Sequence, residues 1–173
     1  ELMALAKVLE KHPHVYVVSD EIYEHINFSG TFCSIASIPG MLERTITVNG
    51  VAKAFAMTGW RIGYIGAPEF IAKACTKIQG QVTSGANSIA QRATITAVEA
   101  DPSVLNEMVA AFKNRRDLVV GLVKEIPGFK LNVPEGAFYV FPDVSSFFGK
   151  TLKGQLIKDA TDFSMFLLAE ANV

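Results

Sequence analysis

Apolar and polar positions change their spacing several times along this chain. Residues 1–11 place leucine and alanine at intervals of three and four, which predicts an amphipathic helix. Val15–Ser19 and Thr45–Asn49 are instead short runs rich in β-branched residues, the pattern of fully buried parallel strands, and Ile62–Gly66 is a third run of this kind. Strands that alternate with helices predict an α/β fold with a mostly parallel sheet.

Most of the remaining chain favours helices, and one stretch returns to strand spacing. A long helix, capped by Ser103 and ending near Ile126, separates two parts of the chain. We therefore expect residues 1–115 to form one domain and residues 116–173 to begin a smaller α+β domain. The other predicted elements are helices over Glu69–Gln79 (with Pro68 as first helical residue), over Ser88–Ala100 and from about Thr161, strands over Phe129–Val133 and Ala137–Phe141, and a polar loop over Gly149–Gly154.

Composition excludes several classes of function. Apolar residues make up 50% of the 173 positions, charged residues 19%, and the net charge is -1, so no basic surface for nucleic acid or membrane is expected. The two cysteines, Cys33 and Cys75, lie far apart, which favours a reducing compartment, and we expect a cytoplasmic protein. The three histidines lack the spacing of metal ligands, so no metal site is expected.

Both ends of the chain have patterns expected in the middle of a longer polypeptide. The first helix has no capping residue before it, and Val173 falls where a strand is expected to follow the last helix. The mean hydropathy of +0.28 is high for a free-standing domain. We therefore expect an internal fragment of a longer polypeptide.

Four side chains are candidates for a shared site. Asp20 and Lys53 each follow an apolar strand closely, and ligands of open α/β sheets bind at the carboxyl ends of such strands. Tyr23 lies three residues beyond Asp20, and Arg61 lies in a glycine-rich turn eight residues beyond Lys53. An amine can form a Schiff base, a carboxylate can hold a pyridine nitrogen protonated, and a guanidinium suits phosphate. This set predicts a pyridoxal phosphate site.

Simpler interpretations exist for each residue alone. A lone lysine or arginine in a loop is usually a surface group, and a tyrosine is often a half-buried aromatic with a solvated hydroxyl. Asp20 could cap a turn, or could join Glu21 and Glu24 in a cation site. The order and spacing of all four residues favour the cofactor.

The segments Ser19–Tyr23 and Lys53–Gly63 resemble the class I aminotransferases, which are fold-type I pyridoxal phosphate enzymes, and most closely those that act on aspartate. Ala86–Gln91 and Glu135–Tyr139 give weaker support, and the resemblance covers essentially the whole chain. It implies the second half of the cofactor-binding large domain and the front of the small domain.

The resemblance also implies a role for each residue. Lys53 would carry the cofactor as a Schiff base and move the substrate proton, Asp20 would pair with the pyridine nitrogen, Tyr23 would bond the phenolic oxygen, and Arg61 would bind the phosphate. Many members carry a hydroxyl side chain just upstream of the lysine, where this chain has Ala52 and Gly50. A phosphate contact from that turn is therefore absent or made by backbone amides.

The implied reaction is transamination between aspartate and 2-oxoglutarate by the full-length enzyme. Aromatic, alanine or prephenate aminotransferase activity on the same scaffold remains open, because the family's other phosphate contacts and its substrate-carboxylate arginine fall outside this chain. For the same reason the 173 residues alone are expected to be inactive. The resemblance implies a homodimer, to which residues 83–87 could contribute a contact, although such a turn is more often a helix cap.

Overall fold

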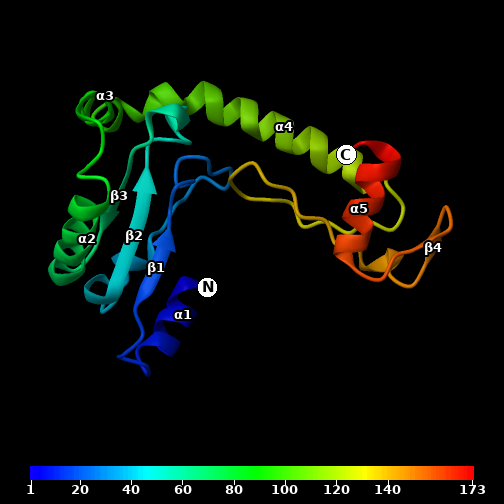
Figure 1. The fold of residues 1–173 in the computed structure, drawn as a ribbon, viewed down its shortest axis with the longest axis horizontal. Helices are drawn as coiled ribbons and strands as arrows, with labels where there is room; N and C mark the ends of the chain where they lie inside the picture. The colour runs from blue at the N-terminus through cyan, green and yellow to red at the C-terminus, as the bar shows by residue number, and fades with distance from the viewer. The chain divides into compact units, whose positions relative to one another are not determined.

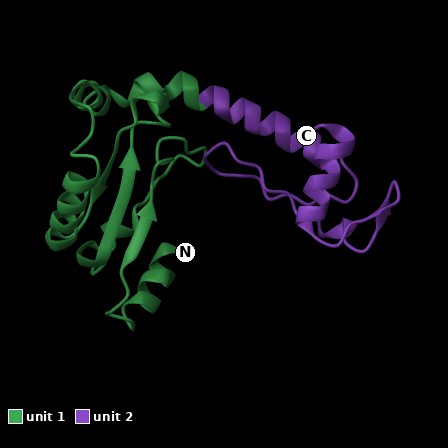
Figure 2. Cartoon of the chain, viewed as in Figure 1, with its two compact units in different colours: residues 1–109 green, residues 110–173 purple.

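The computed structural model describes residues 1–173 and divides them into two compact units, Glu1–Val109 and Ala110–Val173 (Figure 2). This division falls six residues before the domain boundary expected from the sequence, which remains a prediction. Each unit is described by itself.

A three-stranded sheet organises the first unit (Figure 1). It consists of β1 (Val17–Asp20), β2 (Thr45–Gly50) and β3 (Gly63–Gly66), in that order. β1 and β2 are parallel, with Asp20 opposite Val48, whereas β2 and β3 are antiparallel, with Gly50 opposite Gly63. The α/β class is thus confirmed, but the sheet is mixed because the chain returns directly from β2 to β3 without a helical crossover.

The core of this unit lies where α1 (Leu2–Leu9) meets the sheet. Ala6 packs with Ile35, Ile38 and Met41, and Val17 of β1 packs against this cluster. Val18, the next residue, points to the opposite face and is 71% exposed. The expectation of fully buried strands is therefore wrong for β1, and for β3 as well, whose residues are all exposed.

Arg44 forms hydrogen bonds that connect the segments at the beginning of the sheet. It ends the short 3-10 helix η2 (Leu42–Arg44), directly before β2. Its guanidinium donates hydrogen bonds to the carbonyl oxygens of Leu9 (2.7 Å), His12 and Val15. One side chain thus joins the end of α1 and the approach to β1 to the start of β2.

Three helices follow the sheet: α2 (Glu69–Val82), α3 (Ser88–Val98) and α4 (Asn106–Lys124). Pro68 is the N-cap of α2, not its first helical residue. The predicted cap at Ser103 is wrong, because a 3-10 turn, η4 (Pro102–Leu105), precedes α4 and Asp101 caps that turn. Hydrogen bonds from Ser103 to the Asp101 carboxylate hold the pKa of Asp101 below its usual value.

The second unit contains most of α4 and the last helix, α5 (Ala160–Ala171), which begins one residue before its predicted start. The strands predicted over residues 129–133 and 137–141 do not form, and an isolated bridge joins Lys130 to Asp143. Ala137 has a φ of 57°, which interrupts an extended backbone. A small hairpin, β4 (Thr151–Leu152) with β5 (Gln155–Leu156), forms instead, and it starts in the predicted loop.

Aromatic contacts replace strand pairing in the second unit. The rings of Phe147 and Phe163 stack at 4.9 Å, and Phe129 packs edge-on against both. The apolar run around Phe129 therefore contributes side chains to a cluster and not a strand to a sheet. No helix of either unit is both long enough and apolar enough to cross a membrane.

Gly50, at the end of β2, leaves no room for a side chain. A Cβ there would lie 2.9 Å from the carbonyl oxygen of Ile62 and 3.1 Å from the Cα of Gly63, both backbone atoms of the neighbouring segment. We expect Gly50→Ala to lower the free energy of unfolding by about 1–3 kcal/mol, because the antiparallel pair must shift. Urea unfolding measures the effect. Gly66→Ala is the matched control, since a Cβ at that position contacts nothing within 4 Å, and equal losses in both variants would contradict the expectation.

Candidate functional site

The carboxyl ends of β1 and β2 lie side by side because these two strands are parallel. The backbone N–H of Glu21 donates to the carbonyl of Val48 at 2.8 Å, which extends the pairing past the end of β1. Asp20 is the last residue of β1, and Lys53 follows three residues after β2 ends. Both residues singled out from the sequence therefore emerge at the same edge of the sheet.

Lys53 lies in a compact turn that is anchored on both sides. Val51 and Ala54 are buried, with 0% and 2% of their surface exposed. The N–H of Ala56 donates to the Lys53 carbonyl at 3.2 Å, and the Thr58 hydroxyl donates to the Ala52 carbonyl at 3.0 Å. The lysine is half-buried, while the turn that carries it is fixed to the core.

Tyr23 lies beside this lysine. The Lys53 Nζ atom is 5.9 Å from the centroid of the Tyr23 ring, within the range of a cation–π contact. The structure thus brings together two of the residues predicted from sequence although they are thirty positions apart.

Asp20 has one carboxylate oxygen in a local turn. Its Oδ1 accepts a hydrogen bond from the N–H of Ile22 at 3.2 Å, and the side chain is exposed. The cation site considered for this segment is not supported, because its other two carboxylates have different partners. Glu21 accepts from the hydroxyls of Ser19 (3.0 Å) and Ser34 (2.7 Å), and Glu24 accepts from Asn49. No group of three or more metal-ligating side chains gathers anywhere in the chain.

Arg61 ends the short 3-10 helix η3 (Thr58–Trp60) in a left-handed conformation, with φ 56° and ψ 46°. Such a conformation is uncommon outside glycine and often occurs at functional sites. The guanidinium donates to the Thr58 carbonyl at 2.8 Å. Gly63, two residues on, pairs with Gly50, so Arg61 returns the chain to the strand that precedes Lys53.

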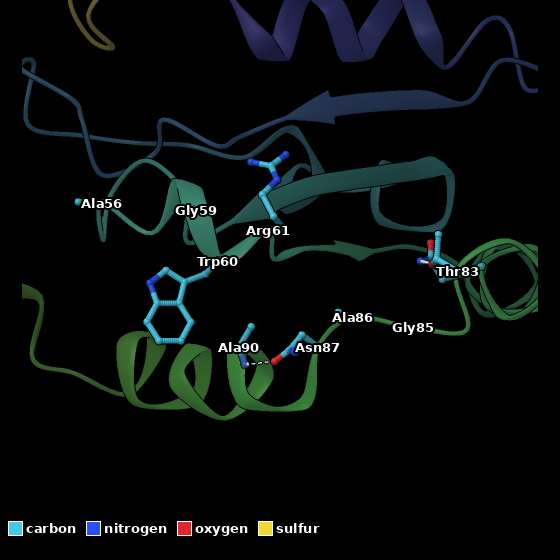
Figure 3. A pocket seen from close by; sticks show the side chains of 10 residues that line it. Ala56, Gly59, Trp60, Arg61, Thr83, Gly85, Ala86, Asn87 and Ala90 are labelled. Atoms are coloured by element: carbon cyan, nitrogen blue, oxygen red, sulfur yellow. Dashed lines mark hydrogen bonds between the residues drawn. The ribbon is translucent and has the colours of Figure 1, made fainter.

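Arg61 also lines a cavity of about 740 Å³. Figure 3 shows that Trp60 and Arg61 leave the loop in different directions and that the start of α3 lies across from them. Asn87 caps α3, and its Oδ1 accepts from the N–H groups of Ile89 (2.9 Å) and Ala90 (3.1 Å). The other lining residues are Ala56, Gly59, Gln79, Thr83, Gly85 and Ala86.

The predicted contact segment 83–87 is thus part of this cavity. The cap expected from its Thr-Ser-Gly turn is instead Asn87, and Thr83 ends α2 by donating its N–H to the Gln79 carbonyl. Nearby, the Gln91 side chain donates to the Ala86 carbonyl at 2.8 Å. This bond joins the two ends of Ala86–Gln91, the first of the two segments that gave weaker support to the resemblance. The other, at residues 135–139, lies in the second unit.

The sequence did not reveal a second set of contacts at this edge. Asn49, on β2, donates from Nδ2 to Glu24 Oε1 at 2.7 Å, and the His25 ring packs edge-on against Phe55 at 6.0 Å. Burial, and to a lesser degree the Glu24 carboxylate, raise the pKa of the Tyr64 hydroxyl. Glu24 and Asn49 are 25 positions apart, so no spacing rule could have joined them.

Comparison with known proteins gives a consistent result over the whole chain. The family model for aminotransferase class I and II matches residues 1–173. The chain is 46% identical to an aspartate aminotransferase from Pinus pinaster, over 99% of this chain and 36% of that protein. It is also 46% identical to a bifunctional aspartate aminotransferase and glutamate/aspartate-prephenate aminotransferase from Petunia hybrida, over 99% of this chain and 37% of that protein.

A solved structure of an aminotransferase is also similar to this chain. The crystal structure of the aspartate aminotransferase from Rhizobium meliloti superimposes with a TM-score of 0.92 at 46% identity, covering 98% of this chain and 43% of that one. The chain therefore spans less than half the length of each of these three proteins.

Proposed function

The chain belongs to the class I and II aminotransferases, and on that premise we propose that the protein containing it is a pyridoxal phosphate-dependent transaminase. The observation that carries the proposal is the position of Lys53 Nζ, 5.9 Å from the Tyr23 ring, beyond the carboxyl ends of two parallel strands. That is where α/β sheets bind ligands.

The residues at this edge fit the polar groups of pyridoxal phosphate one by one. The Lys53 amine matches the aldehyde, the Asp20 carboxylate the ring nitrogen, the Tyr23 hydroxyl the phenolic oxygen, and the Arg61 guanidinium the phosphate. The carboxylate is exposed and one of its oxygens accepts from the Ile22 N–H, so it can also accept a proton-bearing nitrogen.

Each residue then has a defined task. Lys53 would hold the cofactor through its amine and, when that amine is free, would move a proton at the substrate α-carbon, first as general base and then as general acid. Asp20 would keep the ring nitrogen protonated, and the Tyr23 hydroxyl would donate to the phenolic oxygen. When bound, the cofactor supplies an electron sink for the negative charge that develops at the α-carbon.

The proposed substrates are aspartate and 2-oxoglutarate. The similarity to the Pinus pinaster and Rhizobium meliloti proteins supports aspartate as the amino donor. The similarity to the bifunctional Petunia hybrida protein supports prephenate as a second candidate acceptor. A panel of amino donors and 2-oxo acids, assayed with the full-length protein, separates these candidates, and activity with none of them would overturn the proposal.

A second candidate function applies to the 173 residues taken alone, namely a folded module without catalytic activity. The exposure of Asp20 and Arg61 supports it, because water reaches groups that a catalytic site usually shields. We expect borohydride reduction with pyridoxal phosphate to label Lys53 stoichiometrically in the full-length protein. Mass spectrometry maps the label, and scattered modification of surface lysines would contradict the assigned role.

The wider organisation follows from the same proposal. Residues 1–115 would form part of the cofactor-binding domain and residues 116–173 the beginning of a small domain. The full-length protein would act as a homodimer on amino-acid and 2-oxo-acid substrates, without nucleic-acid or membrane partners. Both cysteines are free and exposed, which supports a cytoplasmic location.

A further inference from the structure

The segment that carries Tyr23 is linked to the strand before Lys53 by a part-buried side-chain pair. Asn49 Nδ2 donates to Glu24 Oε1 at 2.7 Å, across 25 positions of sequence. Asn49 is 9% exposed, and Glu24 keeps 28% of its side chain in contact with solvent. A hydrogen bond to a charged acceptor at this depth is stronger than one between neutral groups.

The Asn49 amide has its orientation fixed by a second bond. Its Oδ1 accepts from the N–H of Gly50 at 2.7 Å, so its NH₂ group must face Glu24. Gly50 is itself confined by the backbone of Ile62 and Gly63. The amide therefore cannot turn away from Glu24 without leaving a buried polar group unpaired.

Contacts on either side of the pair involve the candidate site. The Tyr23 ring lies 5.9 Å from Lys53 Nζ, and the His25 ring lies 6.0 Å from Phe55, within the Lys53 turn. Glu24 is the residue between these two rings, and it provides the directional bond that the aromatic contacts lack.

We propose that Glu24 and Asn49 are positioning residues, which hold the segment bearing Asp20 and Tyr23 at a fixed separation from the Lys53 turn and thereby set the affinity of the site for pyridoxal phosphate. The inference rests on the function proposed above. Neither residue touches the reacting atoms, so both act through the groups that they align.

The donor and acceptor of the Glu24–Asn49 hydrogen bond can be exchanged by substitution. His25 Nε2 lies 3.3 Å from Glu24 Oε1, and the Glu24 carboxylate also acts on Tyr64, which lies opposite Asn49 across the β2–β3 pair. N49D alone places two carboxylates against each other. E24Q/N49D restores a hydrogen bond with reversed polarity, because the glutamine amide donates to a carboxylate that still accepts from Gly50.

The test measures cofactor affinity in the full-length protein, from the fraction of Lys53 labelled by borohydride against pyridoxal phosphate concentration. We expect N49D to weaken binding by about tenfold or more, and E24Q/N49D to return within about threefold of wild type. A pair with only a structural role would lower the melting temperature of the cofactor-free protein without a selective loss of labelling.

The outcomes are distinct. N49D that binds as wild type does, or a double variant no better than N49D, overturns this inference while the proposed function stands. Wild-type protein without label on Lys53 overturns the proposed function and this inference with it. If N49D does not fold, E24A decides, with an expected loss of about fivefold in affinity, against E43A, an exposed glutamate in η2, as the unchanged control. Wild-type affinity in E24A overturns the inference.

Discussion

Lys53→Ala in the full-length protein is expected to reduce kcat for transamination by at least about 1,000-fold. The change removes the amine that we propose both holds the cofactor and moves the substrate proton, and no other lysine lies in this turn. The turn itself should persist, because its anchors are the buried Val51 and Ala54 and not the lysine side chain. Steady-state kinetics and the loss of borohydride labelling measure the two effects together.

Two further variants distinguish Schiff-base formation by Lys53 from the effect of its positive charge. Lys53→Arg keeps a cation near the Tyr23 ring but cannot form a Schiff base, and we expect it to be as inactive as the alanine variant. Lys73→Ala is the matched control, since that lysine is 75% exposed on α2 and pairs with Glu69 at 2.6 Å. Activity in Lys53→Arg near that of wild type would show that the lysine acts only as a positive charge.

The sequence predicted the part of the fold that carries the site. β2 is within one residue of its predicted range, Lys53 follows it as expected, and Asp20, expected just after β1, is the last residue of that strand. This worked because short β-branched runs bounded by polar turns determine strands locally. Burial could not be predicted from the local pattern, because Val17 packs against the core cluster whereas Val18 is exposed, and this difference depends on which face of the sheet α1 covers.

The second unit shows where local patterns fail. Phe129 and its neighbours have the composition of a strand, yet their rings pack against Phe147 and Phe163, which come from later segments. The left-handed Ala137 could not be anticipated, because alanine has no preference for that conformation. The Glu24–Asn49 bond depends in the same way on strand register, which spacing along one chain does not reveal.

Asp20→Asn offers the sharpest separation of binding from catalysis. The asparagine Oδ1 can still accept from the Ile22 N–H, so the local turn is kept, whereas the amide no longer stabilises a protonated ring nitrogen. We expect kcat to fall by about 100- to 1,000-fold, with the melting temperature and the labelling of Lys53 unchanged.

Cofactor binding and catalysis are expected to separate because, in the proposed roles, Asp20 supplies negative charge at the ring nitrogen whereas Lys53 provides the covalent attachment. Asp20→Glu keeps the charge but moves it by one methylene, so intermediate activity is expected if the carboxylate must meet the ring nitrogen at hydrogen-bond distance. Asp117→Asn, on the exposed side of α4, is the control for a lost carboxylate. Loss of the Lys53 label in Asp20→Asn, or full activity without the carboxylate, would mean that Asp20 serves the turn and not the cofactor.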